Sequence, residues 1–312
     1  MTDDVLVLGA GVIGLTTAVV LAEAGHRVRV WAELPPERTT SSVASGLWGP
    51  GFTPRDLAWS RVTFTELSAL AADPASGVHF ERGLEVSNLS TEPPPWLDDL
   101  PDVRMLGPDE LPDGMLAGLW TTVPLIDLPR YLRHLVDRLS AAGTEIEQRT
   151  VRSLADATRA AGAVVNCTGV AAGKLAGDDT VRPIRGQHVV VRNPGIRHFY
   201  LEAVADVEWT GFFPHGDRVL LGGVSQPGEW SLEPDLEVAE RIRARCVEAE
   251  PKLAGAEVLG HQVGLRPGRP EARLEPERID GTRVIHNYGH AGMGVSLSWG
   301  SAHAVRDLLA GS

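Results

Sequence analysis

The feature that most constrains this chain is a glycine-rich turn between an apolar run and a helix near its start. Residues 5–8 are apolar and predict a buried parallel strand. Gly9, Gly11 and Gly14 follow at once with the G-x-G-x-x-G spacing. Gly9 allows a tight turn, Gly11 lets the backbone approach a pyrophosphate, and Gly14 lets helix and strand pack closely. The helix N-terminus then presents free N–H groups and its positive dipole end to phosphates.

The residues after this turn also fit a dinucleotide site. Gly25 predicts the left-handed residue that ends the helix, and residues 28–31 predict the next strand. Glu33 follows Gly14 by about 20 positions, where an acid accepts the hydroxyls of a ribose. An ordinary βαβ unit with chance glycines is the alternative, and the combined spacing favours the dinucleotide site.

Composition narrows the class of partner. With 312 residues the chain can form one large or two medium domains, and 43% hydrophobic and 22% charged residues are typical of a soluble globule. The net charge of −12 argues against nucleic acid or an anionic membrane as a partner. Cys167 and Cys246 are too few and too far apart to suggest a disulfide framework or a metal site. We expect no membrane span and no metal, a cytoplasmic location by default, and an assembly that can include a homodimer.

Further along, the chain alternates between two patterns. Residues 56–72 predict a helix, and Asp127 is expected to cap another. A strand at residues 163–167 ends at Thr168 and Gly169, a small turn at the carboxyl end of a buried strand. Ligands of open α/β sheets bind at such edges.

The other pattern predicts a second domain. Residues 73–124 are broken by prolines and are expected to be mostly irregular with short strands, one of them near 84–89. Alternation over residues 181–224 predicts antiparallel sheet, and residues 235–250 predict one amphipathic helix. Residues 258–265 are expected to resume the α/β pattern.

The fold class predicted from these patterns is α/β, a Rossmann-like dinucleotide-binding domain interleaved with an antiparallel-sheet substrate domain. The first domain takes residues 1–55, 125–180 and 257–312, and the second, a substrate-binding or cap domain, takes residues 56–124 and 181–256.

Seven segments, in order along nearly the whole chain, resemble the D-amino acid oxidase family, flavoenzymes of the larger glutathione-reductase-like fold. They are residues 9–15, 45–48, 165–170, 185–187, 221–223, 264–270 and 284–290. The two C-terminal segments are the most specific, and they separate an FAD enzyme from an NAD-binding module, which the glycine turn alone leaves open.

The resemblance implies FAD as cofactor and a wide contact surface for it. Residues 38–50 are small and hydroxyl-rich, which fits either a solvated loop or a lining for the cofactor. The predicted FAD contacts are Gly9, Ala10, Gly11, Val12, Ile13, Gly14, Glu33, Thr39, Thr40, Ser41, Gly46, Leu47, Trp48, Val151, Thr168, Gly169, Arg266, Gly289, Ala291, Gly292, Met293, Gly294, Val295 and Ser296.

The same resemblance implies the substrate contacts. Arg266 takes the position of an arginine that holds the α-carboxylate of a D-amino acid, a task suited to a planar guanidinium. A surface ion pair is the alternative for Arg266, and Arg269, which also precedes a proline, is the decoy. The Gly292 carbonyl would accept from the substrate amine, so Arg266 and Gly292 are the expected catalytic groups. His286 and His290 are expected to be structural, because the implied chemistry needs no side-chain base.

The chain departs from the family where substrate tyrosines are usual. Aligned back from Pro214, one tyrosine becomes Gly211, and Trp209 or Tyr200 is expected to substitute in part. The usual glutamine after Leu47-Trp48 is Gly49, and the tyrosine of the C-terminal loop is Met293. The predicted substrate contacts are Arg266, Gly292, Gly211, Trp209 and Gly49.

The resemblance implies FAD-dependent oxidative deamination of D-amino acids to 2-oxo acids, ammonia and hydrogen peroxide, by hydride transfer from Cα to flavin N5 with O2 as acceptor. Three acids, Glu202, Asp206 and Glu208, are expected near the entrance, where they would repel acidic substrates and favour neutral or basic D-amino acids. An oxidase of glycine, sarcosine or another secondary amine stays open as an alternative, as does a flavin dehydrogenase that does not use O2.

Overall fold

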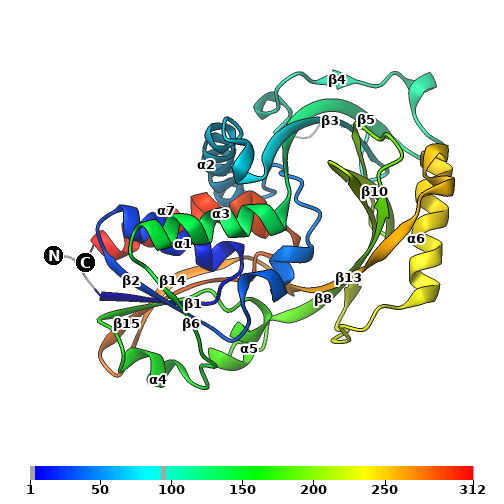
Figure 1. The fold of residues 1–312 in the computed structure, drawn as a ribbon. Helices are drawn as coiled ribbons and strands as arrows, with labels where there is room; N and C mark the ends of the chain where they lie inside the picture. The colour runs from blue at the N-terminus through cyan, green and yellow to red at the C-terminus, as the bar shows by residue number, and fades with distance from the viewer. Residues whose placement is uncertain (1–3, 93–95, 312) are drawn as a thin grey trace.

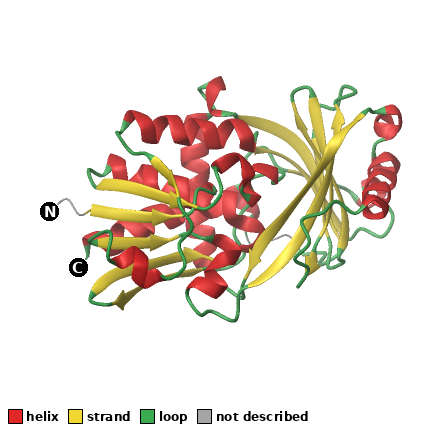
Figure 2. Ribbon diagram, turned by 60° about the horizontal axis from the view of Figure 1, so that its bottom comes forward, coloured by secondary structure: helices red, strands yellow, loops and turns green. Residues whose placement is uncertain are grey.

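Two sheets lie side by side in the computed structural model, which describes residues 4–92 and 96–311. Helices gather around the smaller sheet, whereas the larger sheet carries α6 (Leu236–Ala249) on its outer side (Figure 2). Both ends of the chain lie beside the smaller sheet (Figure 1), so the chain leaves this part and returns to it.

The smaller sheet has six strands within the described residues, and all neighbours are parallel except β14 and β15. In spatial order they are β14 (Arg273–Ile279), β15 (Thr282–Tyr288), β7 (Ala163–Asn166), β1 (Asp4–Leu8), β2 (Arg27–Ala32) and β6 (Ile146–Gln148). One core joins this sheet to the helices α1 (Val12–Glu23), α3 (Leu128–Ala141) and α7 (Gly294–Ala310). Helix α2 (Pro54–Leu70) packs on α7. The short helices α4 (Leu154–Thr158) and α5 (Ala172–Leu175) complete this part of the molecule.

The larger sheet has nine strands within the described residues and curves strongly (Figure 1). Its main path is β12 (Gln226–Pro227), β8 (Arg182–Arg192), β11 (Arg218–Val224), β10 (Glu208–His215), β9 (Phe199–Ala203), β3 (Val78–Ser87), β5 (Ala117–Ile126) and β4 (Arg104–Met105). Strand β13 (Val258–Gly268) pairs with β8 off this path.

The two faces of this sheet pack differently. The outer face carries Tyr200, Phe212 and Leu221, which form a core with α6. The inner face carries Phe199 and Phe213, which join the core of the helices and the smaller sheet. Alternation along each strand therefore assigns every side chain to one of these two environments.

Several predicted elements are confirmed, among them β1, α1, β2, β7 and α6, with bounds that differ by one or two residues. Gly25, with φ of +89°, ends α1 in the left-handed conformation as predicted. The antiparallel sheet predicted over residues 181–224 is also present.

Three predictions about elements are wrong. Residues 73–124 hold β3 and β5, ten residues each and paired along their whole length, where short strands in an irregular segment were expected; residues 93–95 lie outside the described residues. Strand β13 belongs to the antiparallel sheet, not to an α/β pattern. Asp127 is the N-cap residue of α3, as predicted, but the expected capping contact is wrong: its carboxylate accepts from Arg218 at 2.8 Å and makes no capping hydrogen bond. The boundaries of the two domains stay a prediction.

Candidate active site

The glycine turn between β1 and α1 has the geometry that its spacing predicts. Gly9 has a φ of +105°, and a Cβ there would lie 2.5 Å from the Cys167 carbonyl oxygen. A Cβ on Gly14 would lie 2.0 Å from the Gly9 carbonyl oxygen, so helix and turn can touch only without it. A Cβ on Gly11 would approach Ser41 Oγ at 3.1 Å, in the space before the helix N-terminus.

The N-terminus of α1 carries no negative charge of its own. Its first turn has no acidic residue, and the Val12 amide donates to Ser41 Oγ at 2.9 Å. A neutral hydroxyl therefore stands at the end of a helix dipole that favours an anion. This arrangement fits the pyrophosphate of a dinucleotide, with Gly11, Val12 and Ser41 as its neighbours.

The other predicted contacts for the adenosine part follow the carboxyl ends of the parallel strands. Glu33 comes directly after β2 and is exposed. Thr168 and Gly169 follow β7, where the Thr168 hydroxyl donates to Asn166 Oδ1 at 2.7 Å. Val151 lines a surface cavity of about 480 Å³ beside Trp31. These positions are compatible with the predicted cofactor, and the individual contacts stay predictions.

The hydroxyl-rich segment after Glu33 is a connector as well as a lining. The Thr40 hydroxyl donates to the Leu265 carbonyl at 3.2 Å and accepts from the Leu265 amide at 3.3 Å. Gly46, with φ of +81°, accepts from the Ile126 amide, and a Cβ there would lie 2.0 Å from the Ile126 carbonyl oxygen. Trp48 is buried, and its indole N–H donates to the Ser60 carbonyl. A solvated loop is therefore excluded for this segment.

The C-terminal glycine loop brings its backbone into reach of this lining. Gly289 and Ala291 have positive φ values of +83° and +47°, and Gly292 is exposed. Ser296 Oγ, in the first turn of α7, accepts from the Gly49 amide at 3.0 Å. Gly49 is thus tied to α7, the helix that begins two residues after Gly292. A Cβ on Gly49 would meet open space within 4 Å.

Arg266, on β13, is a half-buried cation without an anionic partner among the described residues. Its guanidinium lies over Gly186 on β8, where an added Cβ would be 2.5 Å from both terminal nitrogens. Its one hydrogen bond donates to the Val224 carbonyl at 3.2 Å, and burial lowers the pKa of the guanidinium. The Gly292 Cβ position lies 3.7 Å from Arg266 Cδ, so the two predicted catalytic residues are neighbours.

Arg269, the decoy for Arg266, and the two histidines His286 and His290 have structural surroundings, as predicted. Arg269 forms an ion pair with Asp178 at 3.0 Å. His286 is buried between Asn166 and Glu277, with its Nε2 2.8 Å from the Glu277 carboxylate. Burial lowers the pKa of His290 to about 3, which keeps it neutral and unsuited to accept a proton at neutral pH.

Trp209 occupies the place that the missing tyrosine would take. A Cβ on Gly211, Gly222 or Gly223 would lie between 2.5 and 2.8 Å from atoms of its indole ring. Gly211 is buried beneath this ring, so the predicted substrate contact at Gly211 passes to Trp209. Both substrate contacts stay predictions.

The acids expected at the entrance point elsewhere. The Glu202 carboxylate accepts from the Tyr200 hydroxyl at 3.2 Å and from the Thr210 amide at 2.8 Å. Glu208 pairs with Arg241 and Arg245 of α6, on the outer face of the sheet. The electrostatic argument from these two acids is wrong, because their charges are already engaged away from the inner face.

Two residues beside Arg266 were not predicted as part of the site. Gly186 leaves room for the guanidinium, and His188 lies near it on the same strand, where burial and the Arg266 charge lower its pKa to about 4. The recurrence of the Arg185-Gly186-Gln187 segment in the family was the available signal for Gly186. Nothing in the local sequence distinguishes His188 from other strand histidines.

A family model described as FAD dependent oxidoreductase matches residues 4–308. The chain belongs to this family. FAD is therefore its cofactor, and the glycine turn, the N-terminus of α1 with no acidic residue in its first turn, and the C-terminal loop are the parts that fit it.

Named relatives agree with this assignment. A D-amino-acid oxidase of Rubrobacter xylanophilus is 46% identical over 95% of this chain and 93% of its own length. A D-amino-acid oxidase of Streptomyces coelicolor is 48% identical over 96% and 94%. A human D-aspartate oxidase is 35% identical over 96% and 93%. A glycine oxidase structure from Geobacillus kaustophilus superposes with a TM-score of 0.80 at 20% identity, covering 100% of this chain and 95% of its own, which shows a shared fold.

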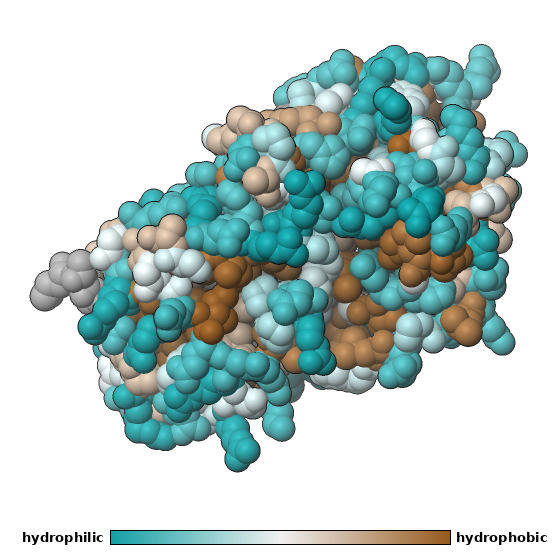
Figure 3. Space-filling model, viewed as in Figure 1, coloured by the Kyte–Doolittle hydropathy of each residue, from teal (hydrophilic) through white to brown (hydrophobic). Residues whose placement is uncertain are grey.

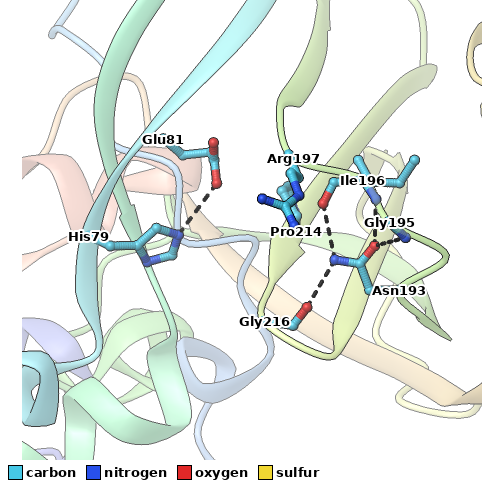
Figure 4. A pocket seen from close by; sticks show the side chains of 8 residues that line it. All are labelled: His79, Glu81, Asn193, Gly195, Ile196, Arg197, Pro214 and Gly216. Atoms are coloured by element: carbon cyan, nitrogen blue, oxygen red, sulfur yellow. Dashed lines mark hydrogen bonds and ion pairs between the residues drawn. The ribbon is translucent and has the colours of Figure 1, made fainter.

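A further cavity of about 370 Å³ opens beside the ends of β3 and β10 (Figure 4). None of its lining residues belongs to the predicted site. Asn193 clamps its rim by donating to the carbonyls of Ile196 and Gly216, and His79 pairs with Glu81 at 3.8 Å. The described helices include none that is long and apolar enough to span a membrane.

Proposed function

We propose that this protein oxidises D-amino acids to 2-oxo acids, ammonia and hydrogen peroxide, with FAD as cofactor. Two relatives named D-amino-acid oxidase, at 46% and 48% identity over nearly the whole chain, support this activity. Arg266 is the observation that carries it in the structure. A guanidinium that is half-buried and has no carboxylate partner in the described residues is suited to bind the carboxylate of an amino acid.

The protein's own residues would orient the substrate. Arg266 binds the carboxylate, and the exposed Gly292 backbone, next to it, offers a carbonyl to the amine. FAD, when bound, supplies the oxidation by accepting a hydride and passing electrons to O2. Clamping carboxylate and amine fixes the Cα between two points, an orientation effect worth on the order of 7–11 kcal/mol of barrier. His188 and His290, both neutral, add no competing charge.

The test compares D- and L-amino acids on the purified, FAD-loaded protein without oxygen. D-alanine or D-valine should bleach the flavin absorbance, and their L-forms should not. Arg266→Gln should lower kcat/KM by roughly 100-fold or more, since a charge-assisted bidentate contact is lost. Arg243→Gln, on the surface of α6, is the matched control and should leave kcat/KM unchanged. Normal turnover by the FAD-loaded Arg266→Gln enzyme would disprove the site.

We also propose that the protein forms a homodimer and is located in the cytoplasm. Apolar patches interrupt the largely hydrophilic face in Figure 3, and Trp230, Leu232 and Leu236 are 59–65% exposed. They support a homodimer, for which light scattering of the purified protein is the test. A cytoplasmic location rests on the sequence alone, and fractionation of the native cells would test it.

A further inference from the structure

Glu85 is the acid that lies on the inner face of the larger sheet. Its neighbours along β3, Leu84 and Val86, pack into the outer core with α6. Because side chains alternate along a strand, Glu85 projects to the opposite, inner face. Directly across from it stand Leu119 on β5 and Leu201 on β9, and both pack against the inner core.

A row of opposed residues connects Glu85 with the site. Leu201 pairs with Gly211, and Gly211 pairs with Gly222. Trp209 lies over these two glycines, and a Cβ on Gly222 would be 3.0 Å from the ring of His188, the neighbour of Arg266. Adjacent strands are about 4.8 Å apart, so Glu85 stands roughly 14 Å along the surface from Gly222. The direct separation of Glu85 and Gly222 is smaller than this surface path, because the sheet is strongly curved (Figure 1).

The Glu85 carboxylate has no hydrogen bond and no ion pair with any residue that the structure describes. The side chain is half-buried, and burial alone raises its pKa to about 7. Leu119 and Leu201, on the two flanking strands, have no polar group that could bind the Glu85 carboxylate. Glu81, on the same face of β3, is itself an acid and cannot neutralise the charge of Glu85. A carboxylate that is partly removed from water and has no partner is stabilised when a cation or a proton meets it.

We propose that Glu85 determines specificity by binding the cationic side chain of basic D-amino acids such as D-arginine and D-lysine. The proposal rests on the function proposed above. With the substrate carboxylate at Arg266, a long side chain that follows the inner face past Trp209 and Leu201 would run toward Glu85. The basic preference expected from Glu202 and Glu208 would then come from a different acid, on the opposite face of the sheet.

The experiment measures kcat/KM of the FAD-loaded enzyme for D-arginine, D-lysine and the neutral, unbranched D-methionine. Glu85→Gln should lower the values for both basic substrates by roughly 10-fold or more, mainly through KM, because a charged contact is lost. D-methionine should stay within about twofold. Glu85→Asp, which keeps the charge, should retain part of the basic preference. Glu81→Gln removes another half-buried carboxylate on the same face of β3 and should change neither class.

The outcomes separate the two proposals. If Glu85→Gln slows all three substrates by one factor, Glu85 has only a structural role, and the specificity proposal is wrong. It is equally wrong if wild type oxidises D-methionine but neither basic substrate, or if Glu85→Gln keeps the wild-type ratios. If wild type oxidises no D-amino acid at all, the proposed function itself fails.

Discussion

At the level of single residues, the position of the Arg266 guanidinium depends on the missing side chain at Gly186. A Cβ there would lie 2.5 Å from both terminal nitrogens, so Gly186→Ala must push the guanidinium away from the sheet. We expect KM for D-alanine to rise and kcat/KM to fall roughly 10–100-fold, the cost of a misplaced hydrogen bond to a charged group. Steady-state kinetics on the FAD-loaded variant measure it. Gly260→Ala, on β13 where a Cβ meets open space, should retain wild-type kinetics, and equal losses in both variants would contradict this explanation.

Which residues could be predicted from the sequence depends on whether they belong to a spaced pattern. Gly9 and Gly14 perform the roles that their spacing assigns, and the motif around Arg266 led to the unpartnered cation. Glu85 had no such signal. The short strand predicted near 84–89 contains Glu85, but the local sequence did not show that β3 pairs with β5 and β9 on its two sides.

At the level of elements, strand β10 holds Trp209 and Gly211 on one face, where the indole fills the place of a tyrosine at 211. Gly211→Tyr alone should therefore clash with the ring, and destabilise the protein by roughly 2–3 kcal/mol. Combining it with Trp209→Thr opens the space, so the double variant should recover much of the loss. Urea unfolding of wild type, the single variants Gly211→Tyr and Trp209→Thr, and the double variant gives the coupling free energy between the two positions, expected at about 1–3 kcal/mol. Additive losses would show that the indole and residue 211 do not share that space.

The long pair β3 and β5 shows why local reading of residues 73–124 failed. Both strands cross between a polar and an apolar environment, so neither presents a simple alternation. The prolines that argued against strands lie largely between β3 and β5, apart from Pro74, which precedes β3, and Pro124, which is inside β5. Pairing between strands so far apart in the chain is a tertiary contact that overrides local propensity.

At the level of the whole molecule, the site exists only because distant segments are tied together. The Thr40 hydroxyl holds Leu265, beside Arg266, and Ser296 holds Gly49. These links were not predictable from either partner's local sequence. They also bury titratable groups. Besides His290, with its pKa lowered to about 3, His188 and His215 have theirs lowered by burial to about 4.

These buried histidines should make the folded enzyme sensitive to mild acid. The unfolded chain binds a proton on each near pH 6.5, whereas the folded chain does so only near pH 4 or below, so stability is lost as pH falls from 6.5 toward 4. Each should cost roughly 2 kcal/mol by pH 5, above the range in which most carboxylates titrate. Urea unfolding at pH 7, 6 and 5 should show this slope reduced in His290→Gln and unchanged in His303→Gln, on the half-exposed side of α7. Protonation of His290 requires its buried site to open. If stability falls with pH as steeply in His290→Gln as in wild type, then His290 is already protonated in the folded enzyme or is in contact with water there.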